Sequence, residues 1–291
     1  MTVGYQTTYS PDHLDLNGKA FDKGKITLHS MTLDTDYSLT NRLNVRVVLP
    51  YIFGKYEGSA PHTLPVDNGS YHATFQDFTA ELRYNVSQRP AVFTPFVRLV
   101  LPSHGYENLA HAAVGRGVRE YHIGINLGRR LDPILPKAFI QAQYSYVFVQ
   151  RILDVSPNRS NVIAQMGYFL TPRLSLLALM QWSHTYRGLD VDFGIPHGGL
   201  TDDEFLHHDQ IGKIRLLDAG VGAFFAVNRK TDIFASWGRT VSGANSHSHA
   251  SVLSLAISRS FGGKSAEDRA SLGTRQGRTS LPETQPRDAS R

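Results

Sequence analysis

Apolar and polar side chains alternate in segment after segment of this chain, and the spacing typical of helices is rare. A period of two places successive side chains on opposite faces, as in a β-strand. In residues 173–187, for example, one face includes Leu174, Leu176 and Met180, and the opposite face includes Arg173, Ser175 and Gln181. The pattern predicts twelve strands, at residues 2–10, 24–37, 42–56, 71–87, 91–102, 117–130, 137–151, 159–171, 173–187, 211–228, 231–242 and 250–261.

The segment 24–37 departs from strict alternation, because its apolar phase shifts between Leu28 and Met31. One extra residue in a strand produces such a shift. We therefore expect a β-bulge between these two residues.

The connections between the segments alternate in length. The short ones carry Pro, Asn or Asp, as tight turns require, and are residues 38–41, 87–90, 131–136, 171–173 and 228–230. The others are mostly longer and are residues 11–23, 57–70, 103–117, 152–158, 188–210 and 242–249. This alternation is typical of an up-and-down outer-membrane barrel with periplasmic turns and extracellular loops. Greek-key crossings in a soluble sandwich would interrupt it.

Strand length and aromatic placement favour a membrane barrel. The segments reach the ~9–11 residues that cross a bilayer at a tilt, and Tyr, Trp or Phe ends the apolar face of several of them. We therefore predict an all-β, twelve-stranded antiparallel up-and-down transmembrane β-barrel over residues 1–261, in a Gram-negative outer membrane. A soluble β-barrel binding module, with its apolar faces inside, is the competing interpretation. Residues 262–291 are poor in apolar side chains and are expected to form a disordered tail.

The last predicted strand reads SVLSLAISRSF, residues 251–261. Leu253, Leu255 and Ile257 share one face, and Phe261 closes the segment. This resembles the terminal signal that the outer-membrane assembly machinery reads, although here about thirty residues follow it. The expected partners are therefore outer-membrane lipid, the assembly machinery and a small-molecule solute.

Composition excludes several other classes of protein. The net charge is +5, but Lys and Arg are scattered singly, so no nucleic-acid partner is expected. The chain has no cysteine, which rules out disulfides, thiol catalysis and Cys-ligated zinc. No run approaches the ~18–20 apolar residues of a transmembrane helix.

If the apolar faces meet lipid, the opposite faces line the lumen. The residues then predicted to point inward are Arg46, Asp77, Glu81, Arg83, Arg98, Glu120, His122, Gln141, Gln143 and Asp218. Opposite charges facing a pore would constrict it and set its selectivity. Alternatively, the charges pair and simply fill the barrel, because twelve strands lie between filled eight-stranded barrels and open porins.

No metal, cofactor or catalytic residue is predicted. Ten of the 13 histidines fall in or beside long loops, and imidazole with carboxylate suits zinc or nickel, but the spacings at 202–210 and 246–249 match no known metal motif. Ser183 and His184 are adjacent in a strand and point to opposite faces, so they cannot form a nucleophile–base pair. We therefore expect no enzyme, and keep a barrel with a plugged lumen, acting as a lipid-modifying enzyme or a surface adhesin, as the alternative.

Several stretches together resemble a known family. They are LPY (49–51), GSYHATFQDFTAELRYN (69–85), TPFVRLVLPSHGYE (94–107), HAAVGRGVREYHIGINLGRRLD (111–132), AFIQAQYSYVF (138–148) and GYFLTPRLSL (167–176). Over roughly residues 25 to 261 the chain is similar to Gram-negative outer-membrane barrels grouped as transporters of the meta-pathway of phenol degradation. The resemblance implies an outer-membrane channel or transporter for passive passage of a small solute through a charged lumen, with an aromatic compound as one candidate cargo.

Overall fold

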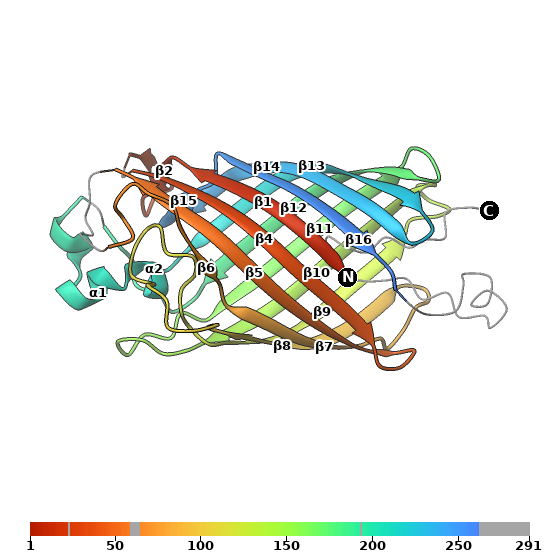
Figure 1. The fold of residues 1–291 in the computed structure, drawn as a ribbon, viewed down its shortest axis with the longest axis horizontal. Coiled ribbons are helices and arrows are strands. Elements are labelled where there is room, and N and C mark those ends of the chain that lie inside the picture. Colours follow the sequence, from red (N-terminus) through yellow and green to blue (C-terminus); the bar gives the residue numbers. More distant parts are fainter. Residues whose placement is uncertain (23, 59–64, 193, 262–291) are drawn as a thin grey trace.

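A computed structural model describes residues 1–22, 24–58, 65–192 and 194–261. Figure 1 shows its long strands wrapped into one barrel. The barrel strands are β1 (Thr2–Ser10), β4 (Lys25–Ser38), β5 (Leu43–Glu57), β7 (Phe78–Tyr84), β8 (Val92–Leu101), β9 (Glu120–Arg130), β10 (Ala138–Val149), β11 (Arg159–Phe169), β12 (Leu174–Thr185), β13 (Arg215–Asn228), β14 (Thr231–Ala244) and β16 (Ser251–Arg259). Each pairs antiparallel with its neighbours in the chain, and β1 pairs with both β4 and β16, which closes the barrel. The predicted twelve-stranded, up-and-down topology is confirmed.

The remaining elements lie at one end of the barrel or extend a strand. The short strand β6 (His72–Phe75) continues the pairing of β7 along β5. A separate three-stranded sheet contains β2 (Asp12–Leu14), β3 (Ala20–Phe21) and β15 (Ser246–Ser248). The helical segments are η1 (Pro196–Gly199), α1 (Asp202–Leu206) and α2 (His208–Ile211). None of the helices in the described ranges has the length and hydropathy of a membrane-spanning helix.

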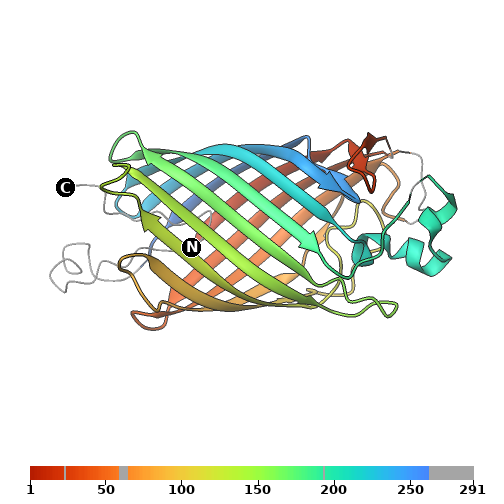
Figure 2. The same cartoon turned by 180° about the vertical axis from the view of Figure 1, so that it is seen from behind.

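The two ends of the barrel differ as the loop lengths predicted. Figures 1 and 2 show the helices and long loops at one end and the tight turns at the other. The Met1 ammonium donates to the Arg259 carbonyl at 3.0 Å, so β1 begins beside the end of β16 at the tight-turn end. An even number of strands requires this arrangement.

The outer face of the barrel carries a band of exposed apolar side chains. Ile123 is 58% exposed and Val221 60% exposed. Aromatic side chains lie among them, with Tyr121 and Trp237 both exposed. A band this apolar is unfavourable in water and stable against lipid tails. The protein is therefore an outer-membrane β-barrel, and the interpretation as a soluble barrel with an apolar interior is wrong.

The bulge predicted in the second strand is wrong. The register of β4 runs without a break against both β1 and β5. The shift in apolar phase has another cause. Ile26 and Leu28 point inward at the loop end, where they pack against Tyr56 and Ala112, whereas Met31 further along is exposed on the lipid face. The environment of the inner face changes along the strand, while the strand itself stays regular.

Two glycines make room for inward-facing aromatic rings. A Cβ built on Gly124 of β9 would overlap the Phe96 ring and the Tyr144 carbonyl oxygen. A Cβ on Gly167 of β11 would likewise overlap the Phe139 ring, which faces it across the β10–β11 pair. Inward aromatics therefore depend on glycine in the adjacent strand.

We predict that Gly124→Ala lowers the free energy of unfolding by about 1–3 kcal/mol, because the added methyl group cannot fit. Gly128→Ala is the matched control. Gly128 faces inward on the same strand, and a Cβ there would lie 3.7 Å from the nearest atom. Urea titration of the protein folded into lipid vesicles measures both variants. Equal stabilities for the two would contradict the packing described here.

Candidate transport path

The interior of the barrel carries a chain of ion pairs on strands β4, β5, β7 and β8. Strand register places Glu81 opposite Arg46 on one side and Arg98 on the other. The Nε atom of Arg98 donates to the Glu81 carboxylate at 2.6 Å, and Arg83 also pairs with that carboxylate. The chain is completed by the pairs Arg46–Asp34 and Arg83–Asp36.

A second cluster surrounds Glu120 at the start of β9. Arg116 and Arg159 each approach its carboxylate to 2.6 Å, and His122 Nε2 lies 3.1 Å away. Arg116 lies in the loop before β9, Arg159 lies in β11, and His122 lies in β9 itself. A buried carboxylate needs such partners, because removing a charge from water is costly.

Amide side chains extend the ion-pair chain along β9, β10 and β11. Arg98 donates to the Gln143 side-chain oxygen at 3.1 Å, and Gln143 donates to Asn126 at 2.7 Å. Gln165 donates to Gln141 at 3.0 Å. The guanidinium of Arg98 is also 5.0 Å from the centre of the Phe96 ring. Arg98 is therefore held in position by a carboxylate, an amide and an aromatic face.

In the pairs of Arg46, Arg98 and Arg159 the positive member is the more exposed one, whereas in the pair Arg83–Asp36 the carboxylate is, at 35% against 3%. The side chain of Glu81 is fully buried and that of Asp34 is 3% exposed. By contrast, the side chains of Arg98, Arg159 and Arg46 are 17%, 14% and 12% exposed. Asp34, Glu81 and Glu120 lie behind these guanidinium groups, so the stretch of wall around Arg46, Arg98 and Arg159 offers positive charge to the lumen.

The opposite wall of the barrel, from β12 round to β1, carries many small inward-facing residues. They include Gly4, Gly220, Gly222, Ser236, Gly238, Ser254 and Ala256. Gln181 of β12 belongs to this inner face, opposite Asp218 in register, and is exposed. Space large enough for solvent therefore borders this wall.

An apolar cluster occupies the interior near the tight turns. It consists of Phe139, Phe169, Leu177, Phe224 and Phe234, with Leu179 and Ala256 packed against it. The sequence analysis did not identify these inward phenylalanines, because it assigned the apolar residues to the lipid face. The sequence does contain a signal for an inward Phe139. This residue lies out of phase with the apolar face of its strand, and its partner in register is the glycine Gly167.

The segment between β8 and β9 folds into the loop end of the barrel. Ala112 packs against the inward residues Ile26 and Tyr56. The Asp67 carboxylate accepts from the backbone N–H groups of His111 and Ala112 at 3.0 and 2.9 Å. Burial alone would raise the pKa of Asp67, but the hydrogen bonds from His111 and Ala112 hold it below its usual value. Helix α2 of the loop 188–214 lies over this segment, since Gln210 Nε2 donates to the Arg116 carbonyl at 2.5 Å.

Histidines from three separate loops meet at the same end. His13, His111 and His247 each offer a ring nitrogen, and these atoms lie within 4.8 Å of one another. Such a group can hold a metal ion, although no metal ligand was predicted. The residues are far apart in the chain, so no spacing in the sequence could reveal the group.

The predicted lumen residues fall into two sets. Those that join the ion pairs and amide bonds described above are Arg46, Glu81, Arg83, Arg98, Glu120, His122, Gln141 and Gln143. Asp77 and Asp218 lie elsewhere. Asp77 accepts from the Tyr106 hydroxyl, and Asp218 accepts from Thr240 at 2.7 Å and lies 2.9 Å from His249 Nδ1. For both sets, a part in solute passage stays a prediction.

The predicted assembly signal lies on the outer face. Leu253, Leu255 and Ile257 are each about half exposed, and Phe261 follows the last strand with 64% exposure. The tail proposed for residues 262–291 lies outside the described residues, and recognition by the assembly machinery stays a prediction.

Ser183 and His184 do not form a catalytic pair. The Ser183 hydroxyl donates to Asn161 at 2.9 Å. The ring of His184 stacks parallel to Trp182 at 5.8 Å and contacts Tyr186, which is exposed. The two side chains are therefore on opposite faces, as alternation predicted.

Comparison with solved structures places the fold among outer-membrane channels and porins. The chain is similar to an outer membrane channel from Pseudomonas putida F1, with 16% identity and a TM-score of 0.63 over 89% of this chain and 94% of that one. It is also similar to the porin NanC, with 8% identity and a TM-score of 0.52 over 90% of this chain and 100% of the porin. No protein-family model and no curated protein matches the sequence. Identities this low establish the shared barrel fold.

We predict that Glu81→Gln lowers the free energy of unfolding by about 3–5 kcal/mol, because it leaves buried guanidinium groups without their carboxylate. The control is Glu57→Gln, which breaks the ion pair between Glu57 and Lys55. The Glu57 side chain is 53% exposed. Exposed pairs contribute about 0–1 kcal/mol, so the control should change little. Urea titration in lipid vesicles compares them, and an equal small effect for both would show that the Glu81 cluster does not stabilise the barrel.

Proposed function

We propose that this protein is a passive channel for small solutes, and that it has no enzymatic activity. The observation that carries the proposal is the asymmetry of the interior. Paired charges occupy the wall formed by β4 to β11, while the facing wall carries many Gly, Ala and Ser residues beyond the phenylalanine cluster near the tight turns. The small residues leave room along this part of the wall, where the exposed Gln181 borders solvent-sized space.

The charge of the exposed wall favours anions. Arg46, Arg98 and Arg159 reach the lumen more than the carboxylates that neutralise them. A solute beside these three arginines is therefore closer to positive than to negative charge, and the low-dielectric wall strengthens that field. Small organic anions should pass more readily than cations of the same size.

Two observations support an aromatic cargo. The phenylalanine cluster around Phe139 and Phe224 provides an apolar, aromatic environment near the tight turns, and aromatic rings pack favourably on one another. The sequence also resembles the barrels grouped with the phenol meta-pathway, and we propose membership of that family. An aromatic carboxylate would suit both the arginine wall and the phenylalanine cluster.

The loop end restricts the size of the solute. The inserted segment that contains Ala112 narrows this end, and α2 lies over it. The interior is thus suited to small molecules, in contrast to the wide channel of sixteen-stranded porins.

We predict that the purified protein conducts ions across planar bilayers with a preference for chloride over potassium. Arg98→Ala should reduce the chloride-to-potassium permeability ratio by roughly twofold or more, because it removes the most exposed of the three guanidinium groups of Arg46, Arg98 and Arg159. The control is Arg151→Ala, which removes an arginine that is 66% exposed in a loop. Reversal potentials in a salt gradient give the ratio. Absence of conductance would favour the plugged barrel, and an unchanged ratio in Arg98→Ala would remove this residue from the path.

A pair of solutes tests the cargo. Benzoate and benzylammonium have the same ring and opposite charges, and we expect benzoate to enter vesicles containing the protein faster than benzylammonium. Phe224→Ala should slow benzoate more than acetate, because only benzoate can contact the ring. Uptake into vesicles without protein provides the background. If benzylammonium is faster, the proposed anion path is wrong; if acetate and benzoate respond equally, the aromatic cargo is wrong.

A further inference from the structure

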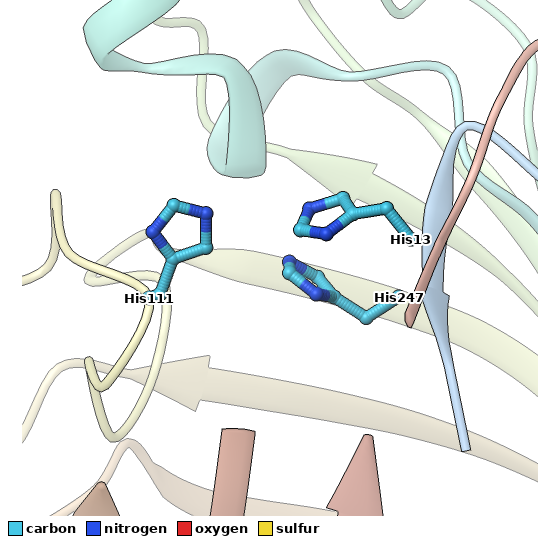
Figure 3. A group of neighbouring side chains, drawn as sticks. All are labelled: His13, His111 and His247. Atoms are coloured by element: carbon cyan, nitrogen blue, oxygen red, sulfur yellow. The ribbon is translucent and has the colours of Figure 1, made fainter. Parts of the chain in front are cut away.

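The loop end of the barrel contains a cluster of side chains that the channel function does not use. His13 lies in β2, His111 in the inserted segment, and His247 in β15. His208 and Asp209 begin α2. Figure 3 shows His13 and His247 side by side, with a ring nitrogen of His111 directed toward both. The pairing of β2 with β15 fixes two of these residues, because His13 and His247 are direct partners in register.

The spacing of the rings is short for side chains from separate segments. The ring centres of His13 and His247 are 3.7 Å apart, and that of His111 lies 5.7 and 5.6 Å from them. The donor atoms of these three residues lie within 4.8 Å of one another, and so do those of His111, His208 and Asp209. His111 belongs to both groups, so the two form one cluster.

The cluster also has the supporting contacts that a metal site requires. His111 Nδ1 lies 3.4 Å from the buried carboxylate of Asp67, which leaves the other ring nitrogen for the cluster. The ring of Tyr56 stacks on His111 at 4.7 Å. Asp209 Oδ1 lies 3.5 Å from both His208 Nε2 and His247 Nε2. A carboxylate behind an imidazole fixes ring orientation and increases ligand basicity in known metal sites.

We propose that His13, His111 and His247 bind one divalent transition-metal ion, with His208 or Asp209 completing its coordination. Several imidazoles with one carboxylate are donors that suit zinc, nickel or copper, whereas calcium and magnesium prefer oxygen ligands. In a tetrahedral zinc site, Zn–N bonds of about 2.0–2.1 Å hold the nitrogens about 3.4 Å apart. Small side-chain movements therefore suffice to close the cluster around an ion.

The bound ion would add a link between parts of the chain that lie in different elements. His13 and His247 belong to the small outer sheet, His111 to the segment inside the barrel, and α2 to the covering loop. One ion would therefore hold the inserted segment to the loops above it. The channel mouth would become more rigid when the metal is bound, since the metal binds the assembled loops and not the separated ones.

The test is direct zinc binding by tag-free, chelator-treated protein folded in detergent. Isothermal titration with zinc chloride should show one strong site per chain, and cobalt bound there should give the visible absorption of tetrahedral nitrogen coordination. His111→Ala and His247→Gln should each weaken zinc binding by about tenfold or more. The matched control is His72→Ala. His72 lies outside the cluster and contacts Asn68. This variant should bind zinc as the unmodified protein does.

Folding is checked in each variant by its heat-dependent migration on gels. Zinc should also raise the melting temperature of the unmodified protein and of His72→Ala, but not that of His247→Gln. Absence of a strong zinc site in the folded, unmodified protein would overturn the proposal. Strong binding that survives both His111→Ala and His247→Gln would overturn it as well, because the ion would then bind elsewhere.

Discussion

A chain inside a membrane must satisfy every backbone hydrogen bond with its own groups, since lipid offers no partners. The pairing of β1 with β16 meets this constraint by leaving no free edge among the barrel strands. Closure then fixes the direction of every side chain, because alternate residues must face lipid or lumen. The apolar band, the interior charges and the placement of the loops all follow from that closed pairing.

The interior has to accommodate buried charge, and it does so by pairing. Glu81 pairs with Arg83 of its own strand and Arg98 of the adjacent strand, and Glu120 pairs with Arg116 of the preceding loop and Arg159 of β11. Because most of these partners lie on barrel strands, the charges gather on one continuous wall, and the small residues of β13, β14 and β16 face them. The asymmetry that supports a solute path is thus a consequence of how the protein stabilises its interior charge.

Strand number, topology and side-chain direction could be predicted from the sequence because they depend on a local period of two. The prediction was wrong where the inner face is apolar. Ile26 and Leu28 look out of phase in the sequence, yet they face the inserted segment, and Phe139 faces other phenylalanines. The meeting of His13, His111 and His247 could not be predicted at all, because it depends on how distant loops fold over the mouth.

The absence of cysteine from the chain allows a direct test of the solute path. Gln181→Cys places a single thiol on the small-residue wall, and Ser145→Cys places one at a buried position of the charged wall. The path described here predicts that Gln181→Cys reacts with a small water-soluble thiosulfonate, and faster with an anionic reagent than with a cationic one of similar size. Ser145→Cys should react slowly with both. If Gln181→Cys is as unreactive as Ser145→Cys, the lumen is closed and the account of a channel is wrong.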